Sequence, residues 1–325
     1  MRRWIRWVLA AGGLGLAVGG GTALAVVQLR WDRTFEAPAE EVVASTDPAV
    51  IEHGRQLAYG AAHCADCHLD PATELPEVAR GKFLPLAGGR TFVTPIGVFP
   101  SPNLTPDPET GIGRRTDAEL LRLLRHNVRH DGRAALPAMN FQDLSGEDMV
   151  AVVSFLRSQP PVRRAFPDRQ VNLLGKAVFA FAIAPAGPSG EPPAAAPSGP
   201  TVERGHYLAH SVAACYGCHT ERNPVDGSFV GAPFSGGTPF DDETDEGFVL
   251  VPPNLTPEPR TGRIAHWTEE GFVRRFRAGN AHPGSHMPWA SYGRMSDDDL
   301  RAIFRYLRTL APVENDTGPS RRPRT

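Results

Sequence analysis

The stretch Cys64-Ala65-Asp66-Cys67-His68 decides the fold, because it returns later in the chain as Cys215-Tyr216-Gly217-Cys218-His219. In each stretch two thiols stand one helical turn apart and a histidine follows directly. This is the spacing for covalent attachment of a c-type haem, in which both thiols form thioethers and the histidine binds the iron. The sequence has only four cysteines, so we predict two covalently bound haem c groups. The predicted cofactor-binding residues are Cys64, Cys67, His68, Cys215, Cys218 and His219.

Two other kinds of site use a Cys-x-x-Cys pair. A redox-active pair is typical of a βαβ context, which the sequence does not show here. A zinc site normally brings its cysteine pairs closer together and has no histidine beside each pair. Both alternatives therefore fit the spacing less well than haem attachment does.

The two motifs belong to an internal repeat. The segment from Glu52 to Pro161 recurs from Glu203 to Pro312, and both copies carry an Asn-Leu-Thr-Pro turn, at Asn103 and at Asn254. Repeats of this kind indicate a tandem duplication. We predict two cytochrome c-type domains, at 46–163 and 201–313.

Each copy reads as three helices separated by long loops. Capping residues precede apolar residues at helical spacing, and strand patterns are weak throughout. The fold class predicted is therefore mostly α. The predicted helix starts lie at Asp47-Pro48, Thr116, Ser145, Thr268 and Ser296.

The segment between the domains, 164–200, ends in a tract rich in Pro, Ala, Gly and Ser at 185–200, which is typical of an extended linker. Before it, residues 171–183 are mostly apolar but too few to span a membrane. We expect them to form a helix packed between the domains or against a membrane surface. The tail, 314–325, has no apolar pattern and is predicted to be disordered.

The first 30 residues predict a signal-anchor transmembrane helix. Arg2, Arg3 and Arg6 precede an uncharged run from Trp7 to Gln28, long enough for a bilayer. This places the protein in a bacterial inner membrane, with its haem domains in the periplasm. The alternative is a cleaved signal peptide, since Ala23-Leu24-Ala25 resembles a cleavage site.

A low-spin electron carrier needs a sixth iron ligand, and a methionine sulfur suits this role. Met139 and Met287 each follow the second helix of their repeat, in a loop that contains proline. We predict that they complete the metal sites with His68 and His219. Met149 and Met295 align with core positions instead, and the histidines that remain as substitutes are His130, His282 and His286.

Three side chains are candidates to contact haem propionates or, alternatively, are ordinary turn residues: Arg90, Asn103 and Asn254. Pro71 and Pro224 follow the two motifs and are candidates to shape a carbonyl that fixes the ring of the iron-binding histidine.

Net charge points to no nucleic-acid partner. Lys and Arg number 34 against 36 Asp and Glu, so the formal charge is −2, which implies no strong field for nucleic acid.

The motifs, the two turns and the run Met287-Pro288-Trp289 leading into Tyr292 resemble those of membrane-anchored dihaem cytochromes c. The chain is similar to the cytochrome c subunits of periplasmic alcohol, gluconate and aldehyde dehydrogenases. Those subunits usually hold three haem domains, whereas this chain shows two, so the resemblance names no particular partner.

The resemblance implies an electron carrier with no catalytic residues. Its single electrons would come from a dehydrogenase or quinol and go to a terminal oxidase or a soluble cytochrome. A dihaem peroxidase, in which one iron keeps an open position, is the alternative function. A third possibility is a subunit whose main role is to anchor a dehydrogenase.

Overall fold

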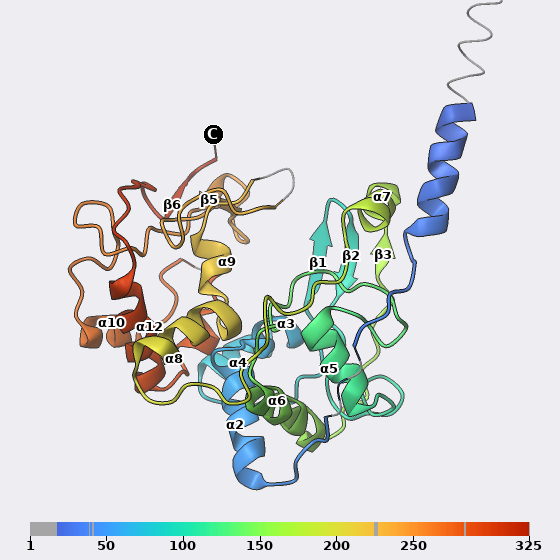
Figure 1. The fold of residues 1–325 in the computed structure, drawn as a ribbon, viewed down its shortest axis with the longest axis horizontal. Coiled ribbons are helices and arrows are strands. Elements are labelled where there is room, and N and C mark those ends of the chain that lie inside the picture. The colour runs from blue at the N-terminus through green and yellow to red at the C-terminus, as the bar shows by residue number, and fades with distance from the viewer. Residues whose placement is uncertain (1–17, 39, 41, 224–226, 283, 325) are drawn as a thin grey trace, which may run out of the picture.

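The computed structural model describes residues 18–38, 40, 42–223, 227–282 and 284–324. Two domains lie side by side, and the linker crosses from one to the other (Figure 1). The helices of domain 1 are α2 (Pro48–Tyr59), α3 (Cys64–His68), α4 (Leu75–Ala79), α5 (Asp117–His126), α6 (Gly146–Ser158) and α7 (Leu173–Phe181). Those of domain 2 are α8 (Val202–Tyr207), the π-helix η1 (Leu208–Val212), α9 (Cys215–His219), α10 (Glu269–Arg277), α11 (Trp289–Tyr292) and α12 (Asp297–Thr309).

The helices begin where the sequence predicts. Asp47 caps α2 by accepting from Ala49 N, with a proline in the first turn. Thr116 forms a complete capping box with Glu119 at the start of α5, and such caps satisfy backbone donors that have no partner within the helix. Ser145, Thr268 and Ser296 cap the later helices with side chains that accept from the backbone N–H three residues on.

Each domain is built on one close helix crossing. A side chain at Gly54 of α2 would overlap the carbonyl oxygen of Ala151 in α6, and Gly205 of α8 stands in the same relation to Ala302 of α12. Only glycine lets the two backbones approach this closely. The crossing is therefore reproduced in both repeats, where it packs the helix before each motif against the last helix of the repeat.

Two small antiparallel sheets complete the domains. One has the order β1 (Thr91–Thr94), β2 (Gly97–Pro100), β3 (Gln170–Val171), and the other β4 (Phe240–Asp241), β5 (Phe248–Leu250), β6 (Arg321–Pro323). Helix accounts for only 36% of the described residues. The prediction of a mostly α fold was therefore wrong, because long loops and these sheets take up much of each domain.

The predicted N-terminal transmembrane helix is not supported. Residues 1–17 lie outside the described residues, and in the described part of the chain no helix is long and apolar enough to cross a membrane. The predicted inner-membrane localisation and membrane anchoring relied on this helix and are withdrawn with it.

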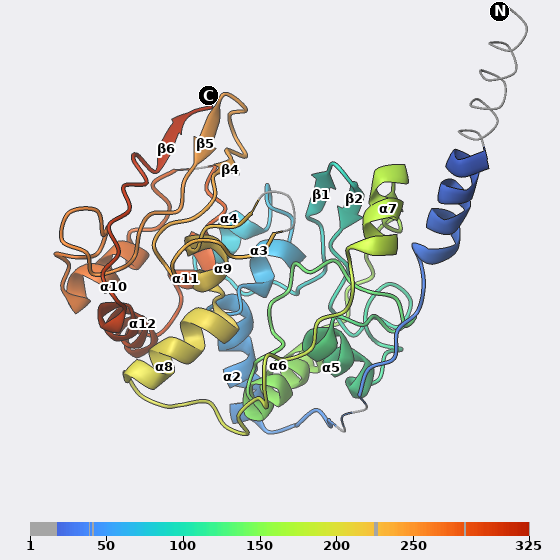
Figure 2. The same ribbon diagram turned by 45° about the horizontal axis from the view of Figure 1, so that its top comes forward.

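Two further segments differ from expectation. Helix α7 lies beside the sheet of domain 1, away from domain 2 (Figure 2), and Gly175 packs closely against the carbonyl of Ile96. The tail, predicted to be disordered, contributes β6, and Arg321 Nε donates to the buried Asp242 carboxylate over 2.7 Å. The tail gains its structure from these long-range contacts, which its own sequence pattern does not reveal.

Candidate haem sites and the junction between them

The two Cys-x-x-Cys-His motifs form short helices of the same shape, α3 and α9. The residue before each helix has a left-handed backbone, with φ of 40° at His63 and 50° at Ala214. This turn brings the chain sharply from the first long helix of the domain into the motif. In each helix the two cysteines stand one turn apart, and the histidine at the end is buried.

Both motif histidines are held by a backbone carbonyl. Nδ1 of His68 lies 2.9 Å from Pro102 O, and Nδ1 of His219 lies 2.9 Å from Pro253 O. Because a carbonyl only accepts, Nδ1 donates and Nε2 keeps its lone pair. Within the described residues no hydrogen bond engages either Nε2, so this atom is available to an iron.

The protonation state of these histidines suits metal binding. Burial lowers the pKa of His68 and of His219, outweighing the carbonyl bond that would raise each. A histidine with a lowered pKa is neutral at neutral pH, which is the form that binds a metal.

The sequence did not identify these carbonyls. We expected Pro71 and Pro224 to shape the acceptor, but the acceptors belong to Pro102 and Pro253; Pro224 lies outside the described residues. The repeated Pro-Asn-Leu-Thr-Pro run was the signal, since a proline precedes the asparagine in both copies.

The asparagine that follows each acceptor proline ties its turn to other parts of the same domain by hydrogen bonds. Asn103 Nδ2 donates to Thr110 Oγ1 (3.1 Å) and Val162 O (2.7 Å), and Asn254 makes the same pair of bonds, 3.1 and 2.8 Å long, in domain 2. Both asparagines are buried. Their amides are used within the protein, which argues against the propionate contacts we considered and equally against a surface position.

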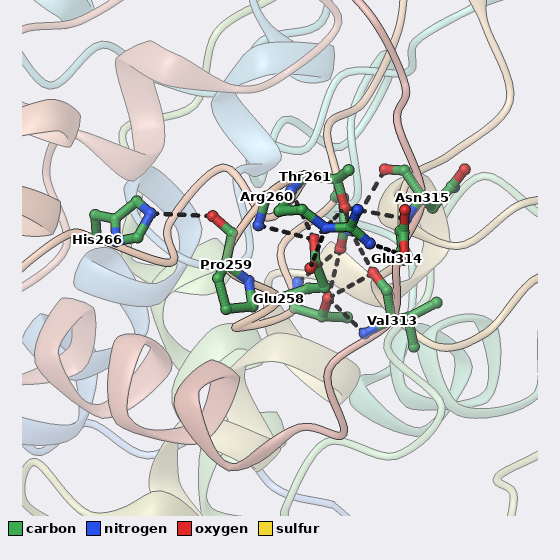
Figure 3. Close-up of polar contacts among 10 residues, drawn as sticks. Glu258, Pro259, Arg260, Thr261, His266, Val313, Glu314 and Asn315 are labelled. Atoms are coloured by element: carbon green, nitrogen blue, oxygen red, sulfur yellow. Dashed lines mark hydrogen bonds and ion pairs between the residues drawn. The ribbon is translucent and has the colours of Figure 1, made fainter.

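Figure 3 shows how this turn is tied to the end of domain 2. Thr261 Oγ1 donates to Glu258 Oε2 over 2.7 Å and accepts from Asn315 N over 3.0 Å. Arg260 pairs with Glu314 at the surface. The segment after α12 thus locks the turn that carries Pro253.

The four motif thiols are available for covalent attachment. All four cysteines are free of disulfides, and burial raises the pKa of Cys64 and of Cys215 to about 12. In the absence of a metal these thiols are therefore protonated at neutral pH. No group of three or more metal-binding side chains exists among the described residues, whereas two thiols and one free imidazole nitrogen fit a haem c at each motif.

The predicted sixth ligands stand at the edge of the core. Met139 and Met287 are half-buried and pack against it, while Met149 and Met295 are 0% and 4% exposed within it. Of the substitutes, His286 has its Nε2 committed to Asp241 O at 2.7 Å, and His130 is exposed. The methionine assignments remain predictions.

Helix α11 links the surroundings of the two motif helices at the domain junction. Ser291 of α11, which is buried, donates to the half-buried Asp66 inside the first motif. The next residue, Tyr292, packs edge-to-face on His63, with ring centroids 5.5 Å apart, and donates its hydroxyl to Ala213 O beside the second motif. Tyr292 is only 5% exposed, and it touches residues adjoining both motifs at once.

Hydrogen bonds and an ion pair also join the two domains on another side of the junction. Tyr207 of domain 2 donates to the domain 1 carboxylate Asp148 (2.6 Å), which also pairs with His53 Nε2 (2.6 Å). Although burial raises it, the pKa of Asp148 is held below its ordinary value by the hydrogen bonds with His53 and Tyr207. Arg90, considered above for a propionate, instead pairs with Glu243 of domain 2.

No family model matches the chain. It is 31% identical to the cytochrome c subunit of an alcohol dehydrogenase (quinone) from Gluconacetobacter polyoxogenes, over 88% of this chain and 63% of that protein. It is 30% identical to the gluconate 2-dehydrogenase cytochrome c subunit of Pantoea cypripedii, over 85% and 62%. A dihaem cytochrome c-type protein of Cereibacter sphaeroides is 29% identical, over 79% of this chain and 84% of its own length.

These similarities confirm the predicted resemblance to cytochrome c subunits of alcohol and gluconate dehydrogenases and to dihaem cytochromes c. They support covalently bound haem c and an electron carrier in place of an enzyme. The chain spans less than two thirds of the length of the two dehydrogenase subunits.

Proposed function

We propose that this chain is a dihaem c-type cytochrome that relays single electrons between its two motifs. It takes them from a dehydrogenase or quinol and passes them to a terminal oxidase or a soluble cytochrome. The observation that carries the proposal is the junction at Tyr292, where residues adjoining both motifs are in contact.

The protein's own residues have separate tasks in this proposal. The four cysteines would hold the two haem groups covalently, and His68 and His219, oriented by Pro102 and Pro253, would bind the irons. Met139 and Met287 would supply the further iron ligand at each site. When bound, the haem iron supplies reversible one-electron chemistry, which requires no acid, base or nucleophile from the chain.

The junction keeps the two motifs at a fixed separation. The Asp66–Ser291 hydrogen bond and the Tyr292 ring lie between the surroundings of the two motifs, and Ser291 and Tyr292 are buried. Buried, fully packed contacts of this kind resist relative motion of the domains. A fixed separation favours exchange between the sites over loss of the electron elsewhere.

A dehydrogenase is proposed as donor because the relatives at 30 and 31% identity are named as subunits of dehydrogenases. The dihaem relative carries no dehydrogenase in its name, so its similarity supports the relay itself.

Rapid-mixing kinetics test the proposal. Holoprotein that receives less than one electron per chain should redistribute it between two spectrally distinct sites. Tyr292→Ala should slow this redistribution, since it removes the ring between the motifs. Its matched control is Phe141→Ala, which truncates the repeat-equivalent ring in domain 1, away from the junction.

Both variants must keep the wild-type visible spectrum for the comparison to hold. A single redox transition in the wild type, or equal slowing in both variants, would contradict the relay.

A further inference from the structure

One face of domain 1 is covered by domain 2. This face consists of α3, α4 and the loop after them, and α11 of domain 2 packs on it. Arg294 Nη1 donates to Val78 O (2.9 Å), and its guanidinium lies 4.1 Å from the centre of the Phe83 ring. Tyr59 and Ala65, which belong to the same face, are buried.

The repeat-equivalent face of domain 2 is open. His210 takes the place of Tyr59 and Tyr216 takes the place of Ala65, and both are only half-buried. Nearby, Phe229 is 40% and Val230 is 60% exposed. Large apolar side chains that are exposed together beside a redox motif mark an interaction surface.

Aromatic rings lead from the second motif out to this face. Tyr216 stands between the two motif cysteines in the sequence. Its ring stacks on His210 with centroids 5.0 Å apart and an interplanar angle of 25°, and His210 stacks on His206 at 4.4 Å and 26°. His206 is exposed. Domain 1 has no such stack, because Ala65 and Arg55 occupy the positions of Tyr216 and His206.

The stack is uncharged at its centre. Burial, and secondarily the neighbouring His206, lower the pKa of His210 to about 4. His210 is therefore neutral at neutral pH and accepts from or donates to Tyr306 at 2.7 Å. A neutral, packed ring costs little to cover with an apolar partner.

We propose that this open face, made of His206, His210, Tyr216, Phe229 and Val230, docks a separate soluble c-type cytochrome that accepts the electron. The inference rests on the proposed relay and names the surface at which the electron leaves this chain. The corresponding face of domain 1 is already occupied by a cytochrome domain. The contact between the domains joins α11 of domain 2 to the motif face of domain 1, which are two different surfaces. The motif face of domain 2 is therefore left without a partner domain.

A second copy of this chain does not suit the face. Domain 1 would have to repeat the Arg294 contact, but the residue at that position is Asp143, which has no cationic donor and is itself held by the linker. Ser189 N donates to Asp143 Oδ1 (2.7 Å), and Gly146 N donates to Pro193 O (3.0 Å). The docked protein is therefore a separate chain.

The step at this face transfers one electron and breaks no bond. The iron bound at the second motif goes from ferrous to ferric, and the iron of the docked cytochrome goes from ferric to ferrous. No proton or further reactant is needed.

Stopped-flow oxidation of the reduced holoprotein tests the inference, with a soluble monohaem cytochrome c of His/Met ligation as the probe. Phe229→Asp with Val230→Asp should lower the second-order rate about tenfold or more, because charge on a docking face opposes apolar contact. Val230→Asp alone, at the more exposed position, should lower it by a smaller factor. Val93→Asp, 80% exposed on β1 of domain 1, is the matched control and should leave the rate unchanged.

Equal rates for the wild type and the double variant would overturn the docking face. So would a wild type that ferricyanide oxidises readily but the probe does not. A reduced wild type that even ferricyanide fails to oxidise would instead show that the proposed relay is wrong, and this inference with it.

Discussion

The two domains share the residues that build a motif and differ in the residues that surround it. Both have the glycine at the helix crossing, the buried asparagine and the carbonyl on the motif histidine. Around them, domain 1 is covered by its neighbour, whereas domain 2 leaves Cys218 exposed. Duplication has preserved the haem-binding framework, and divergence has given one copy an internal position and the other an outward one.

The same contrast appears in one ion pair. At the N-terminus of α6, Asp148 pairs with His53 at 2.6 Å, and at the equivalent place in α12, Asp299 pairs with Arg204 at 2.9 Å. The framework keeps the carboxylate but exchanges a titratable partner for a permanent cation. Only domain 1 should therefore respond to pH at this position.

Removing the attachment thiols should give the largest effect. Cys64→Ser with Cys67→Ser, and separately Cys215→Ser with Cys218→Ser, should each leave one covalent haem per chain, because each motif attaches its own group. Haem absorbance after denaturation and intact-protein mass measure this. Retention of two haems in either variant would break the equivalence of the motifs.

The helix crossings offer the next largest effect. Gly54→Val and Gly205→Val should each destabilise by about 3 kcal/mol or more, because the new side chain overlaps a carbonyl of the partner helix. Denaturant unfolding of the holoprotein gives the values. A mild effect in one domain alone would mean that the two crossings are not equivalent.

Much of this framework could be predicted from the sequence. The motifs, the repeat and the capping residues are local patterns, and the caps place the starts of α2, α5, α6, α10 and α12 correctly. The strands escaped prediction because they contain only two to four residues, too few for a periodic pattern. The junction escaped as well, because Asp66–Ser291 and Tyr292–His63 join positions far apart in the chain that no local rule connects.

Tyr207→Phe tests the junction with a smaller change. It removes the hydroxyl that donates to buried Asp148, and we expect a loss of about 1–3 kcal/mol. The control is Tyr306→Phe, which gives domain 2 the phenylalanine found at the equivalent position of domain 1 and affects only a contact within domain 2. Comparable losses in urea unfolding would argue against a special role for the junction.

The pH response should be the smallest effect. The hydrogen bond with Asp148 raises the pKa of His53 above 6.5, against the opposing effects of burial and of Arg204. The stabilisation from this pair is therefore complete at pH values below the ordinary histidine pKa of 6.5. It is lost as the pH rises through the raised pKa of His53.

His53→Arg should remove this loss, because it gives domain 1 the same kind of pair as domain 2. Melting temperatures measured from pH 5.5 to 8.5 compare the two proteins. An unchanged pH slope in the variant would show that another group is responsible.

Near-infrared magnetic circular dichroism of the oxidised holoprotein tests the central claim most directly. A sulfur of methionine bound to low-spin ferric haem gives a characteristic weak band in this region. The account predicts two low-spin haems with this signature, one lost in Met139→Ala and the other in Met287→Ala. A high-spin haem in the wild type would contradict the two-site relay, and a haem with two histidine ligands would contradict the methionine assignment at its motif.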